Sequence, residues 1–154
     1  DIVLNIQGDE PFISPKQIEL LCSCFTNEQT QIATLIKKID NQSDLENTST
    51  PKVIVNTKQE ALYFSRSCIP HVRGKKTKDW LNSSDFYKHI GLYAYRMKTL
   101  SFITKLPQSK LELAESLEQL RWIENGFTIV TATTTLETIA IDTPQDLERI
   151  KNYL

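Results

Sequence analysis

The chain has 154 residues, of which 40% are hydrophobic and 24% are charged, and its formal net charge at pH 7 is −1. A chain of this length can bury the core of one domain, and its balanced charge excludes bulk attraction to nucleic acid or to an anionic membrane surface. No apolar run approaches the roughly 20 residues that cross a bilayer, so we expect a soluble protein without membrane insertion.

The three cysteines favour a reducing compartment. Their number is odd, which does not suit a disulfide framework. Cys22 and Cys24 lie two positions apart on a predicted helix, so their side chains point to different faces. No second pair of cysteines or histidines stands near them to complete a zinc site. We therefore expect a cytoplasmic protein.

The first half of the chain alternates apolar runs with polar turns. Residues 2–6 predict a short buried strand that is rich in branched side chains. Ser14 is a predicted N-cap, followed by Pro15 at the first helical position and by Gln17 three residues after the cap, and the helix is expected to reach about Phe25. The other elements expected in this half are strands over residues 32–39, 52–56 and 61–65, and a loop or short helix over residues 41–51.

The second half contains a long loop and a strong amphipathic pattern. Residues 70–85 are expected to form a surface loop; its basic stretch, residues 73–78, is interpreted as solvated, with a phosphate contact as the alternative. Leucine spacing predicts one amphipathic helix over residues 111–125, capped by Gly126. The remaining predicted elements are strands over residues 90–96 and 128–134, a short helix near residues 99–104, and a final helix over residues 143–150. Strands alternating with helices predict a layered α/β fold in a single domain over residues 1–154.

Two acidic positions are candidates for a metal site. Asp9 and Glu10 follow the first predicted strand, and Asp142 ends an apolar run just before the last predicted helix. In open α/β sheets, ligands bind beyond the carboxyl ends of the strands. Two converging carboxylates there would suit Mg²⁺, which completes its shell with water and phosphate. Each residue also has an ordinary explanation: Asp9 as a turn former, and Asp142 as a favourable charge at a helix N-terminus.

Other polar residues have both functional and structural explanations. His89 stands among aromatic residues and is interpreted as a structural histidine rather than a base. Arg66 could clamp a carboxylate through two parallel hydrogen bonds, although a surface ion pair is the equal alternative. Glu118, Gln119 and Arg121 are expected on a solvated helix face. The sequence contains no dinucleotide-binding glycine motif, Walker loop, nucleophile elbow or His-Glu-x-x-His zinc motif.

Five ordered segments resemble one enzyme family. They are NIQGDEPFI at residues 5–13, ALYFSRSCIP at 61–70, FYKHIGLYAYR at 86–96, LELAESLEQLRWIENG at 111–126 and IDTPQDLERI at 141–150. In this order they resemble the 3-deoxy-manno-octulosonate cytidylyltransferases, or CMP-Kdo synthetases. The resemblance implies a nucleotide-diphospho-sugar transferase sheet that is mostly parallel, with helices on both faces, and a homodimer. It also implies transfer of CMP from CTP to Kdo, an acidic eight-carbon sugar, with release of pyrophosphate, for lipopolysaccharide assembly.

The same resemblance assigns roles to individual residues. Asp9 and Asp142 would bind Mg²⁺, which would offset the repulsion between two anionic substrates. The residues that would line the sugar pocket are Gln7, Arg66, His89, Tyr93, Glu118 and Gln119. Arg66 would meet the sugar carboxylate, and the others would bind hydroxyls. In-line attack on the α-phosphorus depends mainly on positioning and charge, so no covalent enzyme intermediate is expected.

The sequence departs from the family pattern in two places, so two alternative functions stay open. The family's P-A-R-x-x-S-T-R-L-P-x-K-type segment, which holds the triphosphate, is absent, so we expect a C-terminal portion that is inactive alone. TTTLETIAIDTP, residues 133–144, also replaces the family's glycine-bearing approach to the final aspartate. The alternatives are a cytidylyltransferase for another acidic sugar, such as a sialic acid, and a non-catalytic sugar-binding or dimerisation module.

Overall fold

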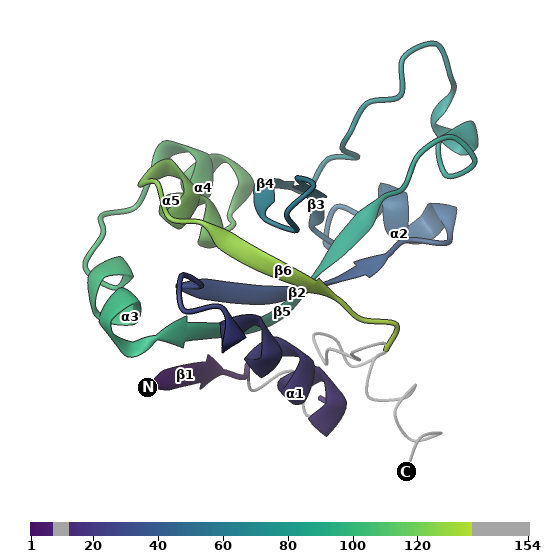
Figure 1. Ribbon diagram of the computed structural model, residues 1–154. Coiled ribbons are helices and arrows are strands. Elements are labelled where there is room, and N and C mark those ends of the chain that lie inside the picture. Colours follow the sequence, from purple (N-terminus) through teal and green to yellow (C-terminus); the bar gives the residue numbers. More distant parts are fainter. Residues whose placement is uncertain (8–12, 137–154) are drawn as a thin grey trace, which may run out of the picture.

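Apolar runs of the sequence form one mixed sheet in the part of the chain that the computed structural model describes, residues 1–7 and 13–136 (Figure 1). The strands lie where the sequence predicts them, except that the longest begins at Tyr87 rather than Ile90. They are β1 (Ile2–Asn5), β2 (Ile32–Lys38), β3 (Lys52–Val55), β4 (Ala61–Ser65), β5 (Tyr87–Arg96) and β6 (Ile129–Thr133). The helix predicted over residues 143–150 lies outside the described residues.

The sheet is built around β5, which has neighbours on both edges. The strand order is β4-β3-β5-β2-β6, and β1 also pairs with β5. β1, β2 and β3 run antiparallel to β5, and β2 with β6 is the only parallel pair among the described strands. The expected α/β class is confirmed, but the expectation of a mostly parallel sheet is wrong for this part of the chain. The short turn over residues 56–60 contributes to this, because it can join β3 and β4 only as antiparallel neighbours.

β1 differs from its prediction in burial. The apolar run predicts a buried strand, yet Ile2 is 38% exposed and no residue of β1 is fully buried. Within the described part of the sheet, β5 is the sole partner of β1. A strand with one neighbour leaves its other edge accessible. The branched apolar residues of β1 are therefore not sufficient to predict that the strand is buried.

Short helices connect the strands. They are α1 (Pro15–Ser23), α2 (Gln42–Glu46), α3 (Met97–Ile103), α4 (Lys110–Glu115) and α5 (Gln119–Glu124). α1 begins where its capping sequence predicts: the backbone N–H of Ser14 donates to Gln17 Oε1 at 3.1 Å. Among the described residues, no helix has the length and apolar character needed to cross a membrane.

The single helix predicted over residues 111–125 is wrong, because the structure divides this segment into α4 and α5. α4 ends at Glu115, and Ser116 adopts a left-handed conformation with φ +52°. A left-handed residue cannot continue a right-handed helix, so α4 ends there. The break turns Leu117 into the core, where it is 7% exposed. Gly126 lies just past the end of α5 with φ +81°, as its predicted capping role requires.

The two faces of the sheet pack against different helices (Figure 1). We call one the aromatic face; it packs against α5 and the α4–α5 break. Its core includes Ile32, Ile36, Phe64, Tyr93, Tyr95, Ile129, Leu117, Leu120 and Trp122. The other, aliphatic face packs against α1 and the turn that follows it. Its core consists of Ala33, Leu35, Ile90, Leu92, Ala94, Leu21 and Phe25. Alternation along β2 thus assigns successive residues to opposite faces.

Lys52, the first residue of β3, is completely buried and binds two carbonyl oxygens. Its ammonium group donates to the carbonyl oxygens of Asn47 at 2.8 Å and Thr50 at 2.7 Å. Burial lowers the pKa of Lys52, so these hydrogen bonds are what make the charged form acceptable there. The side chain therefore fixes the turn between α2 and β3.

Lys52→Met is expected to lower the free energy of unfolding by about 1–3 kcal/mol, because the carbonyls of a partly buried turn lose their donor. Urea unfolding of wild type and variant measures the difference. Lys58→Met, at an exposed position of the β3–β4 turn, is the matched control and should keep the wild-type midpoint. Identical midpoints for both variants would contradict the role assigned to Lys52.

Candidate functional site

Residues of three elements meet on the aromatic face, and we call them the His89 cluster: Phe64 of β4, His89 and Tyr93 of β5, and Gln119 and Trp122 of α5. The ring centroid of His89 lies 5.1 Å from those of Phe64 and Tyr93. The Tyr93 ring meets Trp122 edge to face at 5.2 Å. Gln119 precedes Trp122 by about one helical turn and so shares its side of α5. The fold thus brings together His89 and Tyr93, two of the predicted sugar-pocket residues, and places a third, Gln119, on the helix that packs against them.

His89 is held as a neutral imidazole. Its Nε2 atom lies 3.0 Å from Thr34 Oγ1, and its backbone N–H donates to the carbonyl oxygen of Pro51 at 2.9 Å. The residue as a whole is partly exposed, but the packed aromatic groups remove the hydration that an imidazolium would need. Burial accordingly lowers the pKa of His89 to about 3. At neutral pH the ring can therefore exchange hydrogen bonds with a ligand but is a poor proton acceptor.

Two buried polar groups of the cluster have no partner among the described residues. They are the hydroxyl of Tyr93 and the amide Nε2 of Gln119, and both side chains are about 5% exposed. The Thr34 hydroxyl is near Tyr93 but makes no well-formed hydrogen bond with it. Burial and the neighbouring Tyr95 raise the pKa of Tyr93, so its hydroxyl remains a donor. Buried polar groups are normally paired, which makes these two atoms candidates for ligand contacts.

Arg66 lies just past β4 and binds backbone carbonyls. Its Nε donates to the carbonyl oxygen of Glu115 at 2.7 Å, and its two terminal nitrogens donate to those of Thr48 at 3.1 Å and Ser116 at 3.2 Å. The carbonyls of Glu115 and Ser116 are available because α4 breaks there. A guanidinium has five N–H donors, so Arg66 can anchor the helix break and still offer donors to a carboxylate.

Glu118 lies at the edge of an open groove beside the His89 cluster. Its side chain is 64% exposed, and its Oε1 lies 3.5 Å from Arg121 Nη2. The groove has a volume of about 320 Å³ and is lined by Val3, Leu4, Asn5, Tyr95, Leu100, Ile103, Thr104, Glu118 and Trp122. The groove adjoins the cluster, because its lining residue Tyr95 stacks on Tyr93 at 5.9 Å and Trp122 belongs to both. Sequence reasoning missed Tyr95, although its alternation with Tyr93 along β5 could have revealed it.

The remaining predicted site residues are not brought into this cluster by the described structure. Gln7 is exposed beyond the end of β1. Asp9 and Asp142 lie outside the described residues. Within residues 1–7 and 13–136, no three His, Cys, Asp or Glu side chains gather as a metal ion would need. The Mg²⁺ site therefore stays a prediction that depends on Asp9 and Asp142.

The interpretation of a solvated helix face holds for Glu118 but is wrong for Gln119, which is 5% exposed, and for Arg121. Its guanidinium makes a two-pronged contact with Glu112 of α4: Nε donates to Oε2 at 2.7 Å and Nη2 donates to Oε1. Its Nη1 also donates to the carbonyl oxygen of Leu106 at 3.2 Å. The two charged side chains are only 13% and 8% exposed. The pair fastens α5, with Gln119 and Glu118 at its start, to α4.

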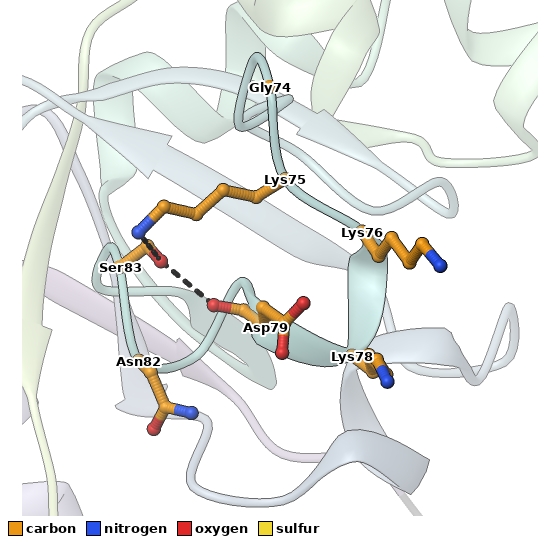
Figure 2. A pocket seen from close by; sticks show the side chains of 7 residues that line it. All are labelled: Gly74, Lys75, Lys76, Lys78, Asp79, Asn82 and Ser83. Atoms are coloured by element: carbon orange, nitrogen blue, oxygen red, sulfur yellow. Dashed lines mark hydrogen bonds between the residues drawn. The ribbon is translucent and has the colours of Figure 1, made fainter.

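The loop over residues 70–85 is a second polar region. A shallow depression there is lined by Gly74, Lys75, Lys76, Lys78, Asp79, Asn82 and Ser83 (Figure 2). Lys75 Nζ donates to Ser83 Oγ at 2.7 Å, and that hydroxyl donates to the carbonyl oxygen of Asp79 at 2.8 Å. Trp80 packs in a small core with Ile39, Leu45 and Phe86. The loop is thus anchored at its base, as a surface loop with a structure of its own, and it shares no lining residue with the groove.

The sequence matches the family described as "Cytidylyltransferase" over residues 1–150. It is 57% identical over 158 residues to the 3-deoxy-manno-octulosonate cytidylyltransferase of Parabacteroides distasonis, in an alignment covering 100% of this chain and 63% of that protein. It is 56% identical over 157 residues to the protein of the same name from Phocaeicola vulgatus, with coverage of 100% and 62%.

The fold is similar to a solved structure of CMP:2-keto-3-deoxy-manno-octonic acid synthetase complexed with CTP. The TM-score is 0.89 at 41% sequence identity, and the match covers 99% of this chain and 61% of that chain. The present chain therefore spans somewhat less than two thirds of the length of these similar proteins.

Proposed function

The chain belongs to the cytidylyltransferase family, and on that premise we propose that the complete protein transfers CMP from CTP to Kdo and releases pyrophosphate. The names of the similar proteins support both substrates. The His89 cluster is the main support for a polyhydroxylated acid as the substrate. In it, the buried side chains of Tyr93 and Gln119 have polar atoms without a hydrogen-bond partner among the described residues. Arg66 binds the carbonyls of the α4–α5 break, which precedes Gln119, and its guanidinium has further N–H donors that could bind a carboxylate.

In the proposed reaction, the anomeric hydroxyl oxygen of Kdo attacks the α-phosphorus of CTP. The new bond joins that oxygen to phosphorus, and the bond between the α-phosphorus and the bridging oxygen breaks. Pyrophosphate leaves, and the hydroxyl proton is released to water. Arg66 holds the sugar carboxylate through charge-assisted hydrogen bonds. Tyr93 and Gln119 donate to sugar hydroxyls, while Glu118 and the neutral His89 accept from them. Such contacts accelerate the reaction by fixing the attacking oxygen in line with phosphorus.

We assign Mg²⁺ to Asp9 and Asp142. Two carboxylates leave most of the octahedral shell for water and phosphate oxygens, which is the usual preference of this ion. When bound, Mg²⁺ would neutralise part of the triphosphate charge and so permit an anionic sugar to approach. Gln7, two residues before Asp9, is assigned to the sugar side of the same region.

The setting of the reaction follows from its substrates. CMP-Kdo would supply lipopolysaccharide assembly, and we place the protein in the cytoplasm as a homodimer on the basis of its family resemblance. The described cysteines, Cys22, Cys24 and Cys68, are all free thiols, as a reducing compartment would leave them. Light scattering coupled to gel filtration tests the dimer directly, and a monomeric mass would contradict it.

A substrate panel tests the proposed function. The complete protein, CTP and Mg²⁺ should release pyrophosphate with Kdo, and at least about tenfold more slowly with a sialic acid or with ATP in place of CTP, since a site built on specific hydrogen bonds rejects mismatched partners. Faster release with a sialic acid would favour the alternative acidic sugar. Binding of Kdo without any release of pyrophosphate would favour a non-catalytic sugar-binding module.

The 154-residue chain is proposed to be inactive alone. It contains no P-A-R-x-x-S-T-R-L-P-x-K-type segment, to which the family resemblance assigns the triphosphate. The same assay on this chain should give no pyrophosphate above background, while Kdo retains weak binding in isothermal titration. Turnover near that of the complete protein would contradict this assignment.

A further inference from the structure

Thr34 is a polar residue in the middle of a buried run of β2. Its neighbours in β2 are completely buried: Ile32, Ala33, Leu35 and Ile36. It lies where the register between β2 and β5 shifts, since Thr34 faces Tyr93 whereas Leu35 faces Ile90. The shift is a β-bulge in β5, and bulges redirect the carbonyls and side chains next to them. Thr34 therefore sits where β5 departs from regular pairing, directly beside His89.

The Thr34 hydroxyl, which also lies near Tyr93, is within hydrogen-bond distance of three other groups but has only one proton to give. Its Oγ1 lies 2.9 Å from the carbonyl oxygen of Leu92, 3.2 Å from that of Ile90 and 3.0 Å from His89 Nε2. Carbonyl oxygens can only accept. If the hydroxyl proton pointed to Nε2, the oxygen would face two carbonyl oxygens with no proton between them. The favourable arrangement sends the proton to a carbonyl of the bulge, so Nε2 must carry a hydrogen and donate it to Oγ1.

We propose that Thr34 is a positioning residue, which accepts the Nε2 proton of His89 and thereby keeps the Nδ1 lone pair available to a hydroxyl of the acidic sugar. The inference rests on the proposed function, which places the sugar at His89. The edge of Phe64 and the tilted ring of Tyr93 fix the plane of the imidazole. No residue in the described ranges hydrogen-bonds Nδ1.

The neutral state of the ring completes the arrangement. Burial lowers the pKa of His89 to about 3, so Nδ1 remains an acceptor at physiological pH. A neutral imidazole has two tautomers, and the partner of one nitrogen decides which is populated. Threonine suits the task because its branched Cβ restricts χ1 in a strand, while its hydroxyl supplies the acceptor. Valine would keep the shape and remove the acceptor, and serine would keep the acceptor.

The test compares Thr34→Val and Thr34→Ser in the complete protein. Ring-labelled histidine NMR reports the tautomer without any substrate, and His89→Gln assigns the signal. Wild type and Thr34→Ser should show the Nε2–H tautomer, whereas Thr34→Val should show a mixture of tautomers. In steady-state assays Thr34→Val should raise the KM for Kdo about twofold to threefold, because only the rings in the Nε2–H tautomer can then accept from the sugar. The KM for CTP should stay unchanged, and Thr34→Ser should keep the wild-type value.

Each result decides one part of the inference. A single Nε2–H tautomer in folded Thr34→Val would overturn it, whatever the kinetics. A tautomer mixture with an unchanged KM for Kdo would overturn the substrate contact assigned to Nδ1. If the wild-type protein turned over no acidic sugar, the proposed function would fail, while the NMR comparison would still decide the Thr34–His89 contact. Thr34→Ala provides the comparison should Thr34→Val fail to fold by circular dichroism.

Discussion

Replacing Asp9 or Asp142 by asparagine is expected to lower kcat of the complete protein by about a thousandfold or more. Asparagine keeps the size of the side chain but removes the charge that a hard divalent cation prefers. The metal is expected to supply several kcal/mol of charge stabilisation, and about 1.4 kcal/mol corresponds to a factor of ten in rate. Pyrophosphate release at saturating CTP and Kdo, measured against Mg²⁺ concentration, gives the loss.

The control for the Asp9 and Asp142 variants is an aspartate away from the proposed site. Asp40→Asn changes an exposed residue after β2 whose carboxylate accepts from Asn41 Nδ2 at 3.0 Å, and it should keep wild-type kinetics. Circular dichroism should show that all three variants remain folded. Near-normal turnover in both Asp9→Asn and Asp142→Asn would remove the metal assignment while leaving the sugar assignments intact.

Breaking the buried pair of Glu112 and Arg121 is expected to lower the free energy of unfolding by about 3–5 kcal/mol, since the remaining charge would be buried without its partner. Glu112→Gln and Arg121→Ala should each show this loss at pH 7 in urea unfolding. Because the pair holds α5, both variants should also weaken Kdo binding through Gln119. Glu28→Gln, at an exposed position after α1, is the matched control for removing one carboxylate.

The same pair predicts a defined pH dependence. The hydrogen bond from Arg121 lowers the pKa of Glu112, so the folded state favours the ionised carboxylate. Its contribution is therefore complete above the unfolded pKa of about 4.3 and is lost as the pH falls through the lower folded value. The stability gap between wild type and Glu112→Gln should be largest near pH 7 and shrink below about pH 4. A gap that stayed constant from pH 7 to pH 3 would contradict the charge-assisted pair.

Local patterns predicted much of the fold. The capping sequence from Ser14 to Gln17 specified the start of α1, and apolar runs located the strands, because such signals depend on residues a few positions apart. The break at Ser116 was not predictable from leucine spacing, since Leu117 fits a continuous helical stripe equally well. The parallel or antiparallel direction of the strands was not predicted either, because it depends on which distant strands pair with β5.

The candidate site was predictable to a different extent. Resemblance to the family supplied the set that includes His89, Tyr93 and Gln119. The fold brings the first two into ring contact and buries the third on the neighbouring helix α5. Burial of unpaired polar atoms is visible only once the chain is folded. Thr34 was not predicted as a site residue, because threonine is common in strands for its shape alone. Its hydroxyl therefore did not indicate a role at the site. Arg121 was misjudged because its partner, Glu112, lies across the helix break.

The central claim is that the complete protein joins CMP to an acidic eight-carbon sugar, and product analysis tests it most directly. Mass spectrometry of a reaction with CTP, Mg²⁺ and Kdo, with the sugar carboxylate isotopically labelled, should show labelled CMP-Kdo formed in equal amount to pyrophosphate. His89→Gln should reduce both products together. Pyrophosphate without a labelled nucleotide sugar, or no nucleotide sugar under any of these conditions, would contradict the proposed transfer.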